Sequence, residues 1–172
     1  MNRRTPEFSR AVLLARLGAE PFRQRIEATA EERELLAQRF DLLALDRLAA
    51  EVELRWQGGD VVVLDAAYDA EYEQSCTVTL DPVRGSVTGR FSLIYGPPDS
   101  EEPEIAMSGE EPAFEPLTSD AIDIGEAVAQ ELSLALPEFP RHPDATIDDF
   151  LEVEPVNGPF SSLAHFRRQN EC

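Results

Sequence analysis

Carboxylates recur at every second position of one strand-like stretch, and they are the residues best placed to do chemistry. In residues 62–80 the even positions are mostly apolar or small, whereas the odd positions carry the acids Asp65, Asp69, Glu71 and Glu73. A period of two sends successive side chains to opposite faces of a sheet, so the pattern predicts a long strand, or two in succession, with one acidic face. No arginine occurs between residues 60 and 81, so we expect the acids to share a surface without a neighbouring base.

Such a row of carboxylates suits two kinds of chemistry. It can bind a basic protein through long-range steering and charge complementarity, or Asp69, Glu71 and Glu73 can hold Mg²⁺ or Ca²⁺. The second alternative would make the chain a divalent-metal-dependent enzyme, such as a nuclease, but no segment has the spacing of an ordered oxygen-ligand loop. We therefore predict a non-enzymatic protein with no catalytic residue, no metal site and no cofactor, which binds a partner through the acidic strand face.

The histidines and cysteines do not stand at spacings typical of a catalytic site. The histidines His142 and His165 stand in neither metal nor catalytic-triad spacing. Cys76 falls at an even, buried position of the predicted strand, where a cysteine usually serves as a small apolar residue. Cys76 and the terminal Cys172 do not make a disulfide framework.

The formal net charge of −19 is unevenly distributed along the 172 residues. Residues 1–58 hold ten arginines and ten acids, whereas residues 59–172 hold five arginines and 24 acids. An acidic surface repels phosphates, so it suits a basic protein better than a nucleic acid. The alternative is direct RNA binding by arginines of the N-terminal third, which are Arg3, Arg4, Arg10, Arg16, Arg23 and Arg25.

The N-terminus lacks the apolar core and cleavage site of a secretory signal, and no apolar run is long enough to span a bilayer. We therefore expect a cytoplasmic protein without a membrane partner. The sequence does not indicate the oligomeric state.

The elements that position the acids follow from periodicity and turn signals. Residues 22–28 alternate as an edge strand with a basic outer face, and a capping box from Thr29 to Glu32 begins a helix over 30–40. Gly58-Gly59 predicts a hairpin between strands at 52–56 and 62–80, and a turn at 81–85 precedes a strand at 87–95. The sequence thus predicts an α+β fold built on an antiparallel meander.

The remaining segments are predicted to flank that meander within a single domain. Asp123 caps a second helix over 124–136, which Pro137 ends. Proline and acids dominate residues 96–119, which predicts a long, mobile, disordered acidic loop, and residues 137–158 are expected to be a loose segment. Residues 158–168 could form a short helix that docks on the sheet through Phe160, Leu163 and Phe166.

Three separated motifs resemble those of the YceD family, the large ribosomal RNA subunit accumulation proteins. They are E-Q-S-C-T-V-T-L-D-P-V at 73–83, D-I-G-E-A-V-A-Q-E-L-S-L-A-L-P at 123–137 and G-P-F-S-S-L-A at 158–164. The resemblance implies a non-enzymatic role in large-subunit rRNA accumulation, processing or stability, in which the partner would be a basic ribosomal protein or assembly factor. Many members carry a C-x-x-C at the central turn, but here Thr77, Val78 and Thr79 follow Cys76, so a zinc site cannot be assembled from this turn.

Overall fold

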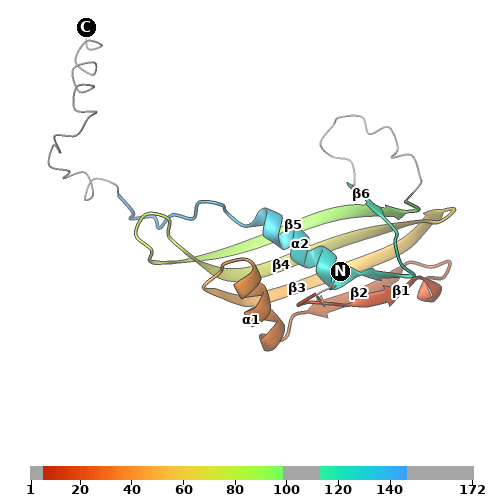
Figure 1. Cartoon of the computed structure of the whole chain (residues 1–172), viewed down its shortest axis with the longest axis horizontal. Helices are drawn as coiled ribbons and strands as arrows, with labels where there is room; N and C mark the ends of the chain where they lie inside the picture. Colours follow the sequence, from red (N-terminus) through yellow and green to blue (C-terminus); the bar gives the residue numbers. More distant parts are fainter. Residues whose placement is uncertain (1–5, 99–112, 147–172) are drawn as a thin grey trace, which may run out of the picture.

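The computed structural model describes residues 6–98 and 113–146. It has an α+β fold in which a long, twisted five-stranded sheet carries two helices against one face (Figure 1). The predicted α+β class, with a mostly antiparallel sheet and two helices, is therefore confirmed. The predictions for Arg3, Arg4, residues 99–112 and residues 147–168 fall outside the described residues.

The centre of the sheet is the predicted meander. The strands β3 (Ala44–Gly58), β4 (Val61–Ser75) and β5 (Pro82–Gly96) follow one another and pair antiparallel. Gly58 and Gly59 make the turn between β3 and β4 with φ angles of +124° and +56°, which residues with a side chain rarely adopt.

Shorter strands flank the meander on both sides. The strand β2 (Phe22–Glu27) pairs antiparallel with β3 and forms one edge of the sheet, as its alternation predicts. At the other edge β6 (Ala113–Pro116) pairs in parallel with residues 93–96 of β5, where the sequence predicted only loop. A strand of four residues is too short for its periodicity to be recognised.

A second, two-stranded sheet holds the N-terminal region against the start of the second helix. It pairs β1 (Ala11–Leu13) with β7 (Ala121–Asp123), and a 3₁₀ helix (Leu14–Arg16) follows β1. Neither strand was expected from the sequence, because three residues carry no readable period.

Both helices begin where their caps predict. The helix α1 (Ala30–Arg39) has the full capping box between Thr29 and Glu32, and α2 (Ile124–Ala135) begins after Asp123, whose carboxylate accepts from the backbone N–H groups of the first turn. Asp123 also accepts from the Ser9 hydroxyl at 2.5 Å and the Arg10 N–H at 2.7 Å. One carboxylate thus caps α2 and ties down the N-terminal region.

The core lies between the helices and the face formed by even-numbered β4 residues. Leu54 and Leu64 from the sheet are fully buried with Leu36 of α1 and Leu132 of α2. This packing leaves the opposite face of β4 without a covering element among the described residues.

Two tyrosines of β4 lie over glycines of the neighbouring strand. Tyr68 pairs directly with Gly89 and Tyr72 with Gly85, and a Cβ atom on either glycine would lie 2.6 Å from the tyrosine ring. The glycines therefore make room for rings that fill the core side of the sheet.

The long strand ends earlier than the sequence predicts. After β4 stops at Ser75, residues 76–81 form a turn in which the Cys76 N–H donates to the Asp81 carbonyl and the Leu80 N–H donates to the Cys76 carbonyl. Leu80 has a φ of +64° and is 76% exposed, so the alternation at 76–80 does not reflect a strand. The turn predicted at 81–85 is also wrong, because residues 82–85 already belong to β5.

Candidate functional site

The odd-numbered side chains of β4 and their neighbours across the strands form one surface, which we call the open face. Its charged members are Arg23, Arg25 and Glu27 of β2, Arg47, Glu51, Glu53 and Arg55 of β3, Asp65, Asp69, Glu71 and Glu73 of β4, and Arg84 and Arg90 of β5. The even positions 62–72 of β4 are buried, whereas all four acids are partly or fully exposed. The predicted alternation is therefore confirmed for this part of the strand.

The expectation that these acids have no neighbouring base is wrong. Three of the four form ion pairs with arginines of the flanking strands: Asp65–Arg55 at 3.1 Å, Asp69–Arg47 at 2.6 Å and Glu73–Arg84 at 3.4 Å. Asp65 also accepts a hydrogen bond from the Ser92 hydroxyl. Glu71 forms no ion pair with any residue that the structure describes. Bases distant in sequence become neighbours because adjacent strands lie about 4.8 Å apart.

These ion pairs are exposed to solvent, so each contributes little to the free energy of folding. The Asp69 and Asp65 side chains are 45% and 40% exposed, and ion pairs at such sites are worth about 0.2–1 kcal/mol each. The Asp69 carboxylate raises the pKa of Arg47, first by its hydrogen bond and then by its charge. A basic group from a partner could replace each arginine at little cost in folding stability.

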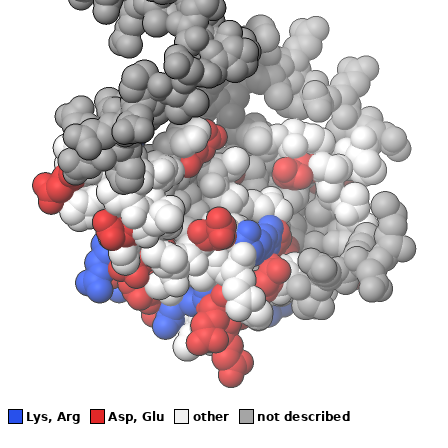
Figure 2. Space-filling view, turned by 60° about the vertical axis from the view of Figure 1, so that its left-hand side comes forward, with Lys and Arg blue, Asp and Glu red and all other residues white. Residues whose placement is uncertain are grey.

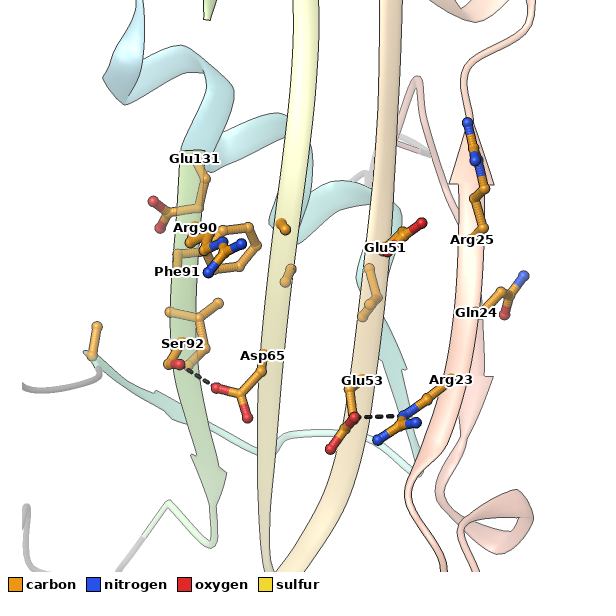
Figure 3. Close-up of a pocket in the computed structure, with 15 residues that line it drawn as sticks. Arg23, Gln24, Arg25, Glu51, Glu53, Asp65, Arg90, Phe91, Ser92 and Glu131 are labelled. Atoms are coloured by element: carbon orange, nitrogen blue, oxygen red, sulfur yellow. Dashed lines mark hydrogen bonds and ion pairs between the residues drawn. The ribbon is translucent and has the colours of Figure 1, made fainter. Parts of the chain in front are cut away.

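A shallow groove of about 950 Å³ crosses the open face (Figure 3). It forms where Ala67 of β4 lies between two long charged residues, Glu51 of β3 and Arg90 of β5, because the short alanine leaves space between them. Asp65 and Glu53 line the same groove. A smaller hollow of about 180 Å³ continues past Asp69.

The charged side chains that line the groove differ between its centre and its sides. Figure 3 shows Glu51, Glu53 and Asp65 on the two middle strands, with Arg23 and Arg25 of β2 on one side and Arg90 of β5 on the other. The Arg23 side chain donates to the Glu53 carboxylate at 2.7 Å. The groove therefore has an acidic centre and a basic flank on β2, whereas Glu131 of α2 lies beside Arg90 on the β5 flank and makes its charge mixed. The alternation of β3 and β5 in the sequence could have indicated that their arginines face the same side as the acids. Only the pairing register shows which arginine lies beside which acid.

The arginines of the RNA-binding alternative do not form one surface. Arg23 and Arg25 lie on the open face, whereas Arg10 donates to both carboxylate oxygens of Glu32 on α1, at 2.6 and 2.9 Å. The Arg16 guanidinium lies 5.8 Å from the centre of the Phe22 ring. Arg10 is thus engaged in a structural ion pair, while Arg23 and Arg25 remain on the groove.

The single described cysteine lies in the turn after β4. Its Sγ accepts hydrogen bonds from the His142 N–H at 3.3 Å and the Thr79 N–H at 3.5 Å, which lower the pKa of Cys76 to about 6. The side chain is fully buried, as predicted, although in a turn and not in a strand.

No group of three or more metal-ligating side chains occurs within residues 6–98 and 113–146. In the same part of the chain, no helix is long and apolar enough to cross a membrane. The side chains that the open face offers are carboxylates and guanidinium groups, which can bind groups of opposite charge.

These features define the chain as an α+β protein with a charged, grooved sheet face. The family model described as "Large ribosomal RNA subunit accumulation protein YceD" matches residues 64–159, from the centre of β4 through α2 and beyond. The chain belongs to this family, which is named for RNA accumulation and not for an enzymatic reaction. No curated protein and no solved structure matches the chain.

Proposed function

We propose that this protein supports the accumulation of large-subunit ribosomal RNA by binding a basic ribosomal protein or assembly factor on its open face. Family membership supports the biological role. The observation that carries the mechanism is the location of Asp65, Asp69, Glu71 and Glu73 on a grooved sheet face that no described element covers.

The charge arrangement suits a basic segment with acids at its margins. Lysines or arginines of the partner would lie over the central carboxylates, while Arg23 and Arg25 at the β2 flank would meet acidic groups. Because the internal ion pairs are exposed, replacing them costs about 0.2–1 kcal/mol each. The net charge of −19 would in addition accelerate encounter with a basic partner.

The test neutralises the four β4 acids together and compares them with an equal number of exposed acids elsewhere. The test variant carries Asp65→Asn, Asp69→Asn, Glu71→Gln and Glu73→Gln. The matched control carries Glu20→Gln, Glu31→Gln, Glu34→Gln and Glu138→Gln, all exposed positions off the open face. Both variants lose the same net charge, so a difference between them reports the location of the charge.

The measurement is a pull-down of tagged protein from growing cells at low and moderate salt, with proteins and RNA identified in the same eluate. The proposal predicts that the wild type and the control retain large-subunit proteins after nuclease treatment. The test variant should retain at least tenfold less of these proteins. Equal retention by the two variants would refute the assignment to the open face. The level of large-subunit rRNA in cells that contain only the test variant should fall in parallel.

The alternative is direct contact with ribosomal RNA through the arginine-bearing N-terminal third. Its structural support is the exposure of Arg23 and Arg25 on the groove. It predicts large-subunit RNA without large-subunit proteins in the eluate, an affinity that falls steeply with added salt, and loss of binding in an Arg23→Gln, Arg25→Gln variant.

A further inference from the structure

One edge of the five-stranded sheet is only partly paired. The strand β5 has 15 residues, but β6 pairs with residues 93–96 alone. On the outer side of residues 82–92 no described strand is paired, and no described group forms a hydrogen bond to their backbone there. In Figure 1 this part of β5 lies at the edge of the sheet opposite β2. We call residues 84–92 the β5 edge.

The pairing of β5 shows which backbone groups face outward. In an antiparallel ladder, alternate residues direct both their N–H and C=O away from the partner strand. The Gly96 carbonyl faces outward, since it accepts from the Leu117 N–H at 2.7 Å, and the register between β4 and β5 is unbroken. Pro82, which has no N–H, agrees with this parity. The residues of the β5 edge with outward backbone groups are therefore Arg84, Ser86, Thr88, Arg90 and Ser92.

The β5 edge lacks the features that usually protect a sheet edge from pairing. Natural edge strands are commonly short, bulged, or lined with charges or proline. The opposite edge strand, β2, has six residues, of which Arg23, Arg25 and Glu27 are charged. Residues 85–89 of β5 read G-S-V-T-G, without charge or proline, and their register with β4 shows no bulge. The β5 edge is therefore suited to accept an added strand.

The groove of the open face extends around this edge. Its lining includes Arg90, which lies on the open face, and Phe91, which the alternation places on the opposite face. Ala113, the first residue of β6, and Glu131 of α2 also line it. Residues on both faces of one strand share a hollow only past the edge of that strand. Space is therefore present beside β5 where the line of β6 would continue.

Glu131 indicates which side chains suit this space. The Tyr68 hydroxyl donates to its backbone carbonyl at 3.4 Å, but its carboxylate has no ion pair or hydrogen bond among the described residues. Burial raises the pKa of Glu131, so a base beside it would favour the charged carboxylate. On the open face, Arg84 and Arg90 would repel bases on the added strand. Bases are therefore expected on one side of that strand only.

We propose that the β5 edge binds an extended segment of a partner protein as an added strand, with basic side chains directed toward Glu131. The backbone of this segment pairs with the even-numbered residues of the β5 edge. Its side chains beside Arg84 and Arg90 are neutral or acidic. The inference goes beyond the proposed function, because it concerns the edge of the sheet and not the four acids of β4.

The experiment uses the full chain and a capped peptide, as long as the β5 edge, in which threonine and lysine alternate. Carboxylates and arginines are interspersed on the face shown in Figure 2, so such a peptide can also bind by charge alone. Amide hydrogen exchange followed by NMR separates the two modes. The odd-numbered amides Val87 and Gly89 face β4 and should exchange slowly throughout. The peptide should slow exchange at Ser86, Thr88 and Arg90 at least tenfold.

A proline at the β5 edge tests the pairing directly. Thr88→Pro removes an outward N–H and leaves the ladder to β4 intact, so it should abolish the slowing at Arg90. Slow exchange at Val87 and Gly89 would show that β5 is still folded. Thr88→Val is the matched control, because it keeps the N–H, and it should retain the slowing. Ser86→Pro is a second variant of the same kind in case Thr88→Pro loosens β5.

The role of Glu131 is tested by its neutral variant. Glu131→Gln should weaken binding of the peptide about threefold, as expected for a partly exposed ion pair. Glu34→Gln is the matched control, an exposed acid on α1, and it should leave the affinity unchanged. A peptide with glutamate in place of lysine should not slow exchange at the β5 edge.

Four results would overturn the proposal. The first is the absence of slowing at the highest soluble peptide concentration, and the second is slowing that persists in both proline variants. The third is slow exchange of the even-numbered amides without peptide at every protein concentration, which would show that the chain covers its own edge. The fourth is slowing that grows with protein concentration alone, which would make a second copy the occupant. The variant without the four β4 acids should retain the alternating pattern, so failure of the proposed function is recognised separately.

Discussion

Replacing Asp123 by alanine should destabilise the protein more than the loss of an ordinary helix cap. Its carboxylate accepts from two N–H groups of α2 and also from the Ser9 hydroxyl and the Arg10 N–H, which are partly buried. Losing the cap costs about 1 kcal/mol, and each partly buried donor left without an acceptor costs about 1 kcal/mol more. The expected decrease in the free energy of unfolding is therefore about 2–4 kcal/mol.

The conservative variant Asp123→Asn separates geometry from charge. Asparagine keeps one acceptor oxygen for the helix N–H groups, so its cost should be about 1 kcal/mol. Asp120→Ala is the control, since the Asp120 side chain is exposed and, among the described residues, only its backbone carbonyl is hydrogen-bonded, to the Leu14 N–H. It should change stability by less than about 0.5 kcal/mol.

Urea unfolding followed by circular dichroism measures all three variants. The midpoint should fall most for Asp123→Ala while the slope with urea stays constant, because the surface exposed on unfolding does not change. A cost below about 1 kcal/mol for Asp123→Ala, or an equal cost for Asp120→Ala, would refute the reasoning that one carboxylate ties the N-terminal region to α2.

Three further predictions concern the fold. Gly89→Ala should lower the urea midpoint by the equivalent of about 1–3 kcal/mol, because a Cβ there would lie 2.6 Å from the ring of Tyr68; an unchanged midpoint would contradict this packing. Glu32, whose pKa is lowered to about 2 mainly by its hydrogen bond to Arg10, stabilises the fold fully above its unfolded pKa near 4.5, and this contribution is lost as pH falls through about 2. After allowance for solvent screening, Glu32→Gln should cost about 1–2 kcal/mol at pH 6 and almost nothing at pH 2, measured as unfolding free energy against pH; a cost independent of pH would count against the ion pair. Cys76 should react with iodoacetamide at least a hundredfold more slowly in the native protein than in urea, despite its lowered pKa, because the side chain is fully buried; peptide-level mass spectrometry reads the rate, and equal rates would show that the turn is open.

Local patterns in the sequence were sufficient for much of the fold. The capping box at Thr29, the cap at Asp123 and the glycine hairpin at residues 58–59 are each encoded within four residues, and all three occur as predicted. Alternation identified β4 and its buried face up to Tyr72. The same alternation failed beyond Ser75, because hydrogen bonds within the turn end the strand while the pattern of side chains continues.

The environment of the acids could not be predicted from β4 alone. Periodicity places Asp65 and Asp69 on one face, but whether a base lies beside them depends on the register of β3 and β5. That register brings Arg55 and Arg47 within ion-pair distance of the two aspartates, so the predicted base-free surface became one of mixed charge.

The sequence by itself determined the helices, strands and turns that are encoded by a few neighbouring residues. It also determined the net negative charge of the chain and its family motifs. The tertiary structure decided which charges are neighbours, where the groove lies and which apolar residues remain exposed. The physical reason is range: caps, turns and side-chain periods act over a few residues, whereas ion pairs such as Asp69–Arg47 join residues 22 positions apart through strand pairing.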